Sequence, residues 1–333
     1  MIKPGNKNLI TDVEGIQVGN AHDAEVFTGV TAVIPERSAV GGVDVRGGGP
    51  GTRETEVLRP DCLVDRVDGI VLSGGSVFGL ESAAGATSAL HHMKRGYQLK
   101  NLTIPIVPSA VLFDLANDGN KDWGDIPPYR DLGRQAVENI SDTFELGNIG
   151  AGYGAAAGTI KGGLGSASAV SDDGVQVGAV IAVNPVGSVL IPGTPNFWAW
   201  PLEQNGEFGG LGAPDLAEDI SLEAISSGRL MENTTIGVVA TNVTLNKAQA
   251  QRVAIMAQDG YARAIRPVHT PMDGDTIFTL STERKSLDIP EPLALARIGA
   301  IAADCVARAV ARAVYNAESL GNLPGYHAKF KKT

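Results

Sequence analysis

Residues 233–242 read NTTIGVVATN and decide the fold, because they form an uncharged, β-branched run that predicts a strand. After this run, residues 246–263 predict a helix with Asn246 as its N-cap. Residues 275–282 alternate like a half-buried strand, and residues 292–317 place apolar side chains at helical spacing. The C-terminal third of the chain is therefore expected to be of the α/β class.

The N-terminal two thirds of the chain alternate in the same way. Short apolar runs predict strands, residues 78–91 predict a small-residue helix, and the glycine-rich residues 44–55 predict an ordered loop. No composition shift marks a domain boundary, so we expect one compact unit over residues 1–333. The expected strands of this part cover residues 29–34, 69–72, 104–107 and 174–183.

Composition limits the function classes. The net charge is −10 and the 27 basic residues are scattered, which argues against nucleic-acid binding. No run of 18 apolar residues predicts a membrane helix, and the first residues have no apolar signal region, so we expect a soluble, cytoplasmic protein. Cys62 and Cys305 lie far apart, which favours reduced thiols. Residues 191–230, rich in Pro, Gly and acidic residues, predict an exposed connector.

Two motifs invite cofactor hypotheses that the pattern does not favour. Residues 147–165 hold eight glycines, but no strict G-x-G-x-x-G opens a helix there and no acidic residue follows at the spacing of a dinucleotide site. Asp273-Gly274-Asp275 could serve as a turn, a cation ligand pair or a catalytic relay. A metal site would need more ligands than the single His269 nearby, so no metal or organic cofactor is expected.

The Asn233–Thr234 bond is the candidate for chemistry. Taken alone, an Asn-Thr pair is an ordinary strand start. Three features add weight to a catalytic hypothesis: the two carboxylates of Asp273 and Asp275, the amide of Asn184 at the end of a strand before Pro185, and glycine loops that offer backbone N–H groups.

With these motifs together, the sequence resembles the DmpA-like family of self-processing aminopeptidases. The resemblance rests on NTTIGVVATN at 233–242 and HTPMDGDTIF at 269–278, and extends to residues 44–55, 72–79, 147–165 and 184–187. The combination of Thr with two Asp residues is most similar to the nylon-oligomer hydrolases of that family. The resemblance implies a four-layer αββα sandwich, shared with the ornithine acetyltransferases, and a homotetramer of processed αβ heterodimers.

The resemblance also implies a mechanism. The hydroxyl of Thr234 attacks the carbonyl of Asn233, and the chain separates into an α chain, 1–233, and a β chain, 234–333. The free α-amine of Thr234, with a pKa of about 8, then serves as the general base.

Each remaining site residue has an implied role. Asp273 and Asp275 orient and polarise Thr234, Asn184 donates to the oxyanion, and Lys161 is the basic group of the glycine-rich segment. Phe113 stands where several relatives have a tyrosine, and Tyr153 is the candidate to supply the missing phenol. The residues implied to line the substrate cleft are Arg46, Gly74, Gly75 and Ser76.

The substrate stays open between two classes: short peptides or amino-acid amides, and linear oligoamides such as 6-aminohexanoate oligomers. An acyltransferase of the ornithine acetyltransferase type is the first alternative, because enzymes of that family also cleave themselves at a threonine and use it as the nucleophile. A non-enzymatic ligand-binding protein, in which the glycines only form turns, is the second.

Overall fold

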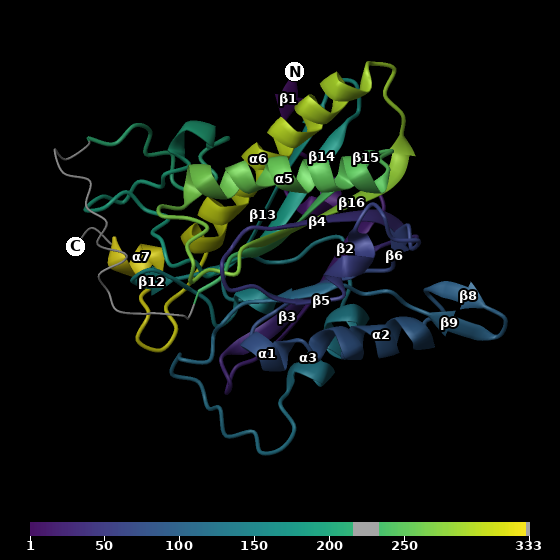
Figure 1. Ribbon diagram of the computed structural model, residues 1–333. Coiled ribbons are helices and arrows are strands. Elements are labelled where there is room, and N and C mark those ends of the chain that lie inside the picture. The colour runs from purple at the N-terminus through teal and green to yellow at the C-terminus, as the bar shows by residue number, and fades with distance from the viewer. Residues whose placement is uncertain (216–232, 331–333) are drawn as a thin grey trace.

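Two mixed β-sheets pack face to face in the computed structural model, which describes residues 1–215 and 233–330 (Figure 1). The larger sheet has the order β1 (Ile2–Lys3), β13 (Gly163–Ser171), β14 (Gln176–Val183), β15 (Ile236–Val243), β16 (Thr276–Lys285), β4 (Ala39–Val45) and β6 (Arg66–Val67). The smaller has the order β2 (Ile16–Asp23), β3 (Thr28–Pro35), β7 (Ile70–Ser73), β10 (Ser109–Val111) and β5 (Gly51–Arg53). Each sheet contains one parallel pair, β15–β16 and β7–β10.

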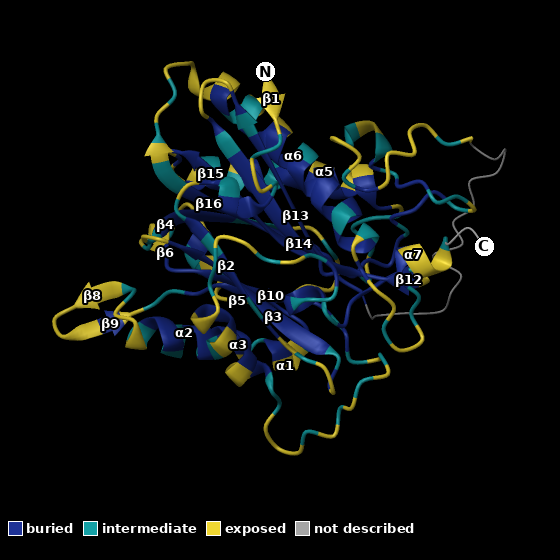
Figure 2. Cartoon of the chain, turned by 180° about the vertical axis from the view of Figure 1, so that it is seen from behind, coloured by how far each residue is buried: buried dark blue, intermediate teal, exposed yellow. Residues whose placement is uncertain are grey.

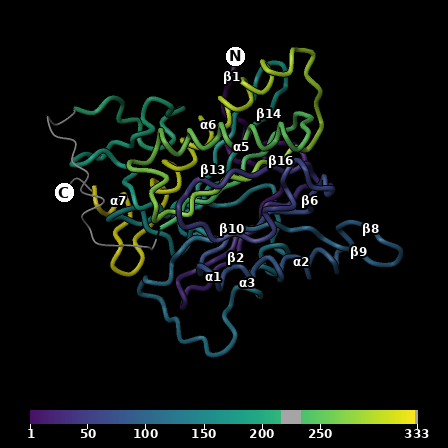
Figure 3. Tube along the Cα trace, viewed as in Figure 1, coloured from purple at the N-terminus to yellow at the C-terminus, as the bar shows by residue number. Residues whose placement is uncertain are grey.

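Helices cover the outer face of each sheet. α5 (Lys247–Ala264) and α6 (Glu291–Tyr315) pack on the larger sheet, and α2 (Ser82–His92) and α3 (Tyr129–Glu138) pack on the smaller. In Figure 3 the N-terminal part of the chain supplies α2 and α3 and the C-terminal part supplies α5 and α6. The expected four-layer αββα sandwich is confirmed.

The remaining elements are short. The β8–β9 hairpin projects from the body of the molecule (Figure 1). Within residues 1–215 and 233–330, no helix has the length and apolar character to cross a bilayer. The short elements are α1 (Ser76–Gly79), α7 (Tyr326–Lys329), the 3-10 turns Ile10–Asp12, Thr55–Leu58, Gly150–Gly152 and Trp200–Leu202, and the hairpins β8 (Tyr97–Leu99)–β9 (Leu102–Ile104) and β11 (Ala156–Ala157)–β12 (Ile160–Lys161).

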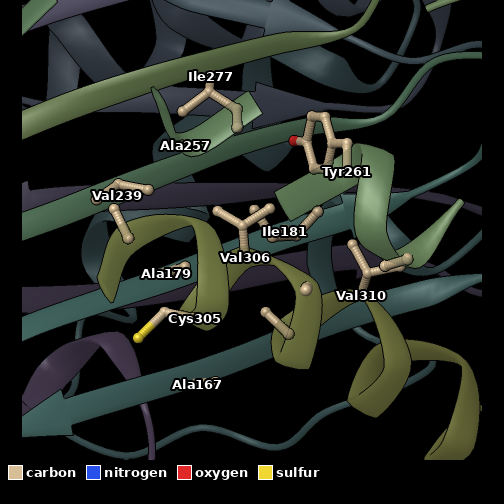
Figure 4. Close-up of a cluster of buried hydrophobic side chains, with 14 of the residues drawn as sticks. Ala167, Ala179, Ile181, Val239, Ala257, Tyr261, Ile277, Cys305, Val306 and Val310 are labelled. Atoms are coloured by element: carbon tan, nitrogen blue, oxygen red, sulfur yellow. The ribbon is translucent and has the colours of Figure 1, made fainter. Parts of the chain in front are cut away.

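Buried apolar side chains fill the spaces between the layers, as the blue interior of Figure 2 shows. Between the sheets, Leu72 and Leu112 meet Val238 and Phe278, all fully buried. Between the larger sheet and its helices lies a second cluster, with Ile181, Val239, Ile277, Tyr261, Val306 and Val310 (Figure 4). Burial of this apolar surface is the main source of stability for both sheets.

Local sequence explains how α5 begins and how closely it packs. The side chain of Asn246 accepts the backbone N–H of Gln249 at 2.9 Å, which confirms the expected N-cap. The helix then lies so close to β4 that a Cβ added at Gly42 would be 2.4 Å from the backbone nitrogen of Gln251. A glycine at this point therefore lets the helix backbone approach the sheet directly.

Most expected elements occur within a few residues of their predicted bounds, and three differ. The expected strand at 104–107 is wrong, because Pro105 and Pro108 lie between β9 and β10 and lack the N–H that a ladder needs. The expected helix at 78–91 is two helices, α1 and α2. The expected loop at 44–55 contains β5, which pairs with β10.

The expected exposed connector at 191–230 is also wrong over part of its length. Phe197 and Phe208 are each 2 % exposed and contact each other edge to face at 5.5 Å. Phe197 also stacks on Tyr326 at 5.0 Å, so this segment completes the core beside α6 and α7. Residues 216–232 lie outside the described residues.

Candidate active site

Thr234 stands immediately before β15 and is buried, with 4 % of its surface exposed. Its backbone N–H donates to the carbonyl of Asn184 at 2.6 Å. Its hydroxyl donates to the carbonyl oxygen of Asn233, across the bond that the sequence marks for cleavage. The Oγ also accepts the backbone N–H of Gly274 at 3.1 Å. The hydroxyl is therefore held against the carbonyl of its own preceding residue.

Asp275 comes to this place because β15 and β16 run parallel, with Ile236 opposite Thr276. Asp275 ends the turn that leads into β16, and its Oδ1 accepts the N–H of Thr235 at 2.8 Å. Its Oδ2 accepts the backbone N–H of His269 at 3.1 Å and lies 2.9 Å from the Nδ1 of that residue. The carboxylate thus holds the peptide that follows the candidate nucleophile.

Asp273 holds the other side of the same turn. Its Oδ1 accepts the N–H of Val186 at 3.0 Å, and its Oδ2 accepts the hydroxyl of Thr270 at 2.6 Å. Burial, together with the charge of Asp275, raises the pKa of Asp273 above its ordinary value. Asp273 therefore fixes the turn, from which the Gly274 N–H reaches Thr234.

The glycine loop after β4 supports this turn with its backbone. Arg46 N–H donates to the carbonyl of Asp275 at 2.9 Å, and Gly49 N–H donates to that of Asp273 at 2.8 Å. The side chain of Arg46 turns away: its Nε bonds Asp44 at 2.8 Å and its Nη2 bonds the carbonyl of Ile255 at 3.2 Å. The structure therefore does not bring the Arg46 side chain to the expected substrate cleft, and its contribution comes from the backbone.

Asn184 links Thr234, the candidate nucleophile, to the glycine-rich segment. Its Oδ1 accepts the N–H of Ala156 at 2.8 Å, and its Nδ2 donates to the carbonyl of Phe113 at 3.0 Å. The backbone carbonyl of Asn184 also accepts the Thr234 N–H, so Asn184 lies beside Thr234, where the sequence predicted it.

Lys161, on β12, is fully buried, and its Nζ donates to the carbonyls of Gly152 and Gly162 at 3.0 Å each. Burial lowers the pKa of this lysine to about 7, and the charge of Asp114 opposes that shift. Its amine therefore changes protonation near neutral pH, within the normal working range of a catalytic base or acid.

Two cavities meet at Asn233 and Phe113, which line both. The larger, about 370 Å³, also borders Thr234, and its lining includes Val77, Leu80, Val111 and Met272 beside polar groups. The smaller, about 100 Å³, is lined in part by Asp114, Asn117, Asn184 and Asn322. Both cavities have polar and apolar lining in similar proportion, so they differ mainly in size, and the larger lies beside the candidate nucleophile.

The expected lining residues divide between these cavities and their support. Ser76 lines the larger cavity. Gly75 lines neither, but its N–H donates to Asp114 at 2.7 Å, and Gly74 packs so closely that an added Cβ would be 2.1 Å from that carboxylate. Tyr153 stacks on His22 at 4.4 Å and also lines neither cavity, so it does not replace the phenol that Phe113 lacks.

Three features of the site escaped the sequence interpretation. The sequence interpretation gives Gly274 only a turn role, yet its N–H donates to the Oγ of Thr234, the candidate nucleophile. His269 was considered only as a metal ligand, and Asp114, the next residue after Phe113, was not considered at all. Burial raises the pKa of Asp114 to about 6, although hydrogen bonds from Thr28 and Gly75 act to lower it. Over the described ranges 1–215 and 233–330, no cluster of three His, Cys, Asp or Glu side chains is placed to hold a metal ion.

Comparison with known proteins identifies the family. Residues 8–327 match the model of peptidase family S58. The chain belongs to this family. An uncharacterized aminopeptidase of Mycobacterium tuberculosis is 41% identical over 344 residues, covering 97% of this chain and 98% of that protein. A 6-aminohexanoate-oligomer endohydrolase of Kocuria sp. is 30% identical over 300 residues, covering 86% and 78%.

The fold of this chain also matches that of solved structures. The L-aminopeptidase D-Ala-esterase/amidase of Ochrobactrum anthropi, described as a variant of the Ntn hydrolase fold, superposes with a TM-score of 0.68 at 22% identity, over 96% of this chain and 89% of that one. A β-aminopeptidase of Burkholderia sp. gives 0.71 at 19%, over 98% and 92%. The protein is thus an S58 enzyme that acts on peptide or amide bonds, which sets aside the non-enzymatic alternative. Its fold is that of the Ntn hydrolases.

Gly274→Ala is expected to block the chemistry of Thr234. A Cβ at this position would be 2.8 Å from the Thr234 Oγ and 2.8 Å from the carbonyl of Gly49, so the turn must move. We expect self-cleavage and amide hydrolysis to fall by about 100-fold or more, the usual scale for loss of one positioned donor. Denaturing gels over time and hydrolysis assays measure both. Gly49→Ala is the control, since its Cβ would meet nothing nearer than 3.8 Å; equal rates in the two variants would contradict this role of Gly274.

Lys161→Met is expected to flatten the pH dependence of stability. The pKa of Lys161 is about 7 when folded, well below the ordinary lysine value of about 10.5 that applies when the chain is unfolded. Between those pH values the unfolded chain binds more protons, so stability rises with pH by up to about 1.4 kcal/mol per pH unit. Lys161→Met should lose this rise between pH 7 and 9, measured by urea unfolding in a Thr234→Ala background that keeps the chain intact. The exposed Lys7→Met should keep it; an unchanged slope in Lys161→Met would show that the lysine stays charged.

Proposed function

We propose that this protein is a self-processing amide hydrolase in which Thr234 first cleaves the bond to Asn233 and then acts as the N-terminal nucleophile. The observation that carries the proposal is the contact of the Thr234 hydroxyl with the Asn233 carbonyl, braced by the Gly274 N–H. A hydroxyl held in this way needs only a small movement to reach the carbonyl carbon.

The self-cleavage proceeds in two steps, an acyl shift from nitrogen to oxygen and the hydrolysis of the resulting ester. First, the Oγ–C bond to the Asn233 carbonyl forms, the C–N bond breaks, and the hydroxyl proton passes to the nitrogen of Thr234. Water then hydrolyses the ester, which gives a carboxylate on Asn233 and restores the Thr234 hydroxyl. The products are the chains 1–233 and 234–333.

In the mature enzyme the new α-amine of Thr234, with an ordinary pKa of about 8, takes the hydroxyl proton during attack on a substrate. The amide nitrogen of the substrate leaves with a proton, and water hydrolyses the second ester. By the resemblance, Asn184 is expected to donate to the oxyanion. Its backbone carbonyl accepts the Thr234 N–H, and its side-chain amide, which also donates to the Phe113 carbonyl at 3.0 Å, borders the same cavity as Asn233. Lys161, whose Nζ lies on the carbonyls of Gly152 and Gly162 and whose pKa is about 7, is the candidate proton donor or acceptor of the glycine-rich segment.

The self-cleavage ester also points to the substrate class. It is an acyl-enzyme whose acyl group ends in Asn233, so the acyl part of a substrate is expected to occupy the place of Asn233. That residue borders both cavities, and we place the acyl side chain in the smaller, of about 100 Å³, whose lining includes the carboxylate of Asp114. We therefore favour short peptides and amino-acid amides with a small acyl residue over 6-aminohexanoate oligomers.

The comparisons support the same preference for peptide and amino-acid amide substrates over nylon oligomers. The mycobacterial protein named as an aminopeptidase is 41% identical, and the nylon-oligomer hydrolases are 30% identical. The greater similarity to the nylon group that the Thr-Asp-Asp pattern suggested does not extend to the whole sequence. Linear oligoamides stay the second substrate class.

Thr234 variants test the processing step. The wild-type chain should give fragments of about one third and two thirds of 34.5 kDa, and the smaller should begin Thr-Thr-Ile-Gly. Thr234→Ala should stay intact and inactive, because it lacks the nucleophile, while Thr234→Ser keeps a hydroxyl and should still be cleaved. Gel electrophoresis and N-terminal sequencing measure these outcomes. A different N-terminus, or cleavage of Thr234→Ala, would remove Thr234 from the role.

Matched anilides test the substrate class. Alanine p-nitroanilide and 6-aminohexanoic acid p-nitroanilide share a leaving group and a free amine and differ in acyl length. We expect kcat/KM to favour the alanine compound by on the order of 10- to 100-fold, because extra methylenes do not fit a cavity of about 100 Å³. Preference for the longer acyl group would assign the enzyme to the oligoamide class, with the nucleophile unchanged. An added panel of amines would reveal acyl transfer as a new amide product.

A further inference from the structure

His269 precedes the Asp273–Asp275 turn and contacts Asp275 twice. Its ring Nδ1 lies 2.9 Å from Asp275 Oδ2, and its backbone N–H donates to the same oxygen at 3.1 Å. A carboxylate offers only acceptors here, so the Nδ1 carries the proton of this bond. The histidine thus holds one oxygen of Asp275 while Thr235 N–H, at 2.8 Å, occupies the other.

The surroundings favour a fixed ring. The side chain of Asp275 is 1 % exposed and that of His269 is 19 % exposed. The ring centroid of Tyr261 lies 6.2 Å from that of His269, on the side of α5. The backbone of His269 is left-handed, with φ 54°, a conformation that few non-glycine residues adopt and that Asn tolerates well. Such an unusual conformation at a functional turn is maintained only where surrounding contacts determine it.

Self-cleavage makes this contact more important. Once the bond to Asn233 is cut, Thr234 is an N-terminal residue and is attached covalently only through Thr235. Its position then depends on its amine at the Asn184 carbonyl, its Oγ at Gly274 N–H, and the Thr235–Asp275 hydrogen bond. His269 supports the last of these three anchors.

We propose that His269 is a positioning residue for catalysis, which fixes the Asp275 carboxylate so that the new N-terminus at Thr234 keeps its alignment. This inference rests on the proposed role of Thr234 as the nucleophile. The histidine acts through Asp275 and does not contact the substrate. The contact of His269 with Asp275 matters because catalytic groups must be held to within about 0.5 Å of their productive geometry, which requires that the residues supporting them are themselves fixed.

Three variants separate positioning from simple packing. His269→Ala removes the ring and its hydrogen bond, and we expect kcat to fall by about 10- to 100-fold, with KM within about 2-fold, as expected for the loss of a hydrogen bond to a charged group. His269→Asn can present an Nδ2–H donor near the same place and suits the left-handed backbone, so it should restore kcat to within about 3-fold of wild type. Asp275→Asn supplies the partner for a double-mutant cycle.

The cycle decides the question even where the Ala variant loses stability. If His269 acts through Asp275, the double variant His269→Ala/Asp275→Asn should be no slower than Asp275→Asn alone. Independent, multiplying effects would overturn the proposal, as would a His269→Asn variant as slow as His269→Ala. Failure of the nucleophile assignment is recognised separately, because Thr234→Ala would then still be processed and active.

Discussion

The parallel pairing of β15 with β16 is the constraint on which the site depends. Thr234 stands just before β15 and Asp275 just before β16, so a parallel register, with Ile236 opposite Thr276, brings the two starts to the same edge of the sheet. An antiparallel pairing would place them at opposite ends. The crossover through α5 makes the parallel arrangement possible, and the apolar face of α5 holds it on the sheet.

Backbone hydrogen bonds then hold in place the residues that the strand register brings together. The glycine loop 46–49 holds the Asp273–Asp275 turn, and Gly274 within that turn holds the hydroxyl of Thr234. Asp275 accepts the N–H of Thr235, the residue after the candidate nucleophile, whereas Asp273 accepts the N–H of Val186 and fixes the turn. The rigidity of this arrangement comes from many main-chain hydrogen bonds, which need little side-chain ordering entropy.

Much of the fold could be predicted from the sequence, because β-branched runs, apolar spacing and the Asn246 cap are local signals. The sequence also singles out Thr234, Asp273, Asp275 and Asn184, which stand at strand ends and which the structure brings together; their catalytic roles stay a prediction. The errors have a different origin. The strand at 51–53 depends on pairing with β10, the burial of Phe197 depends on α7, and the orientation of Arg46 depends on Asp44 and α5. Such long-range contacts leave no mark in a single sequence.

The order of strands in the larger sheet has a consequence for the lifetime of the enzyme. β15 and β16 occupy its interior, between β14 on one side and β4 on the other. A cut before Thr234 would leave both central strands on one polypeptide and their neighbours on another, interlocked without a covalent link. Unfolding would then release two partners that must find each other again, at a cost set by dilution. The protein would be assembled once, as a single chain, and its persistence afterwards would be governed by how slowly it comes apart.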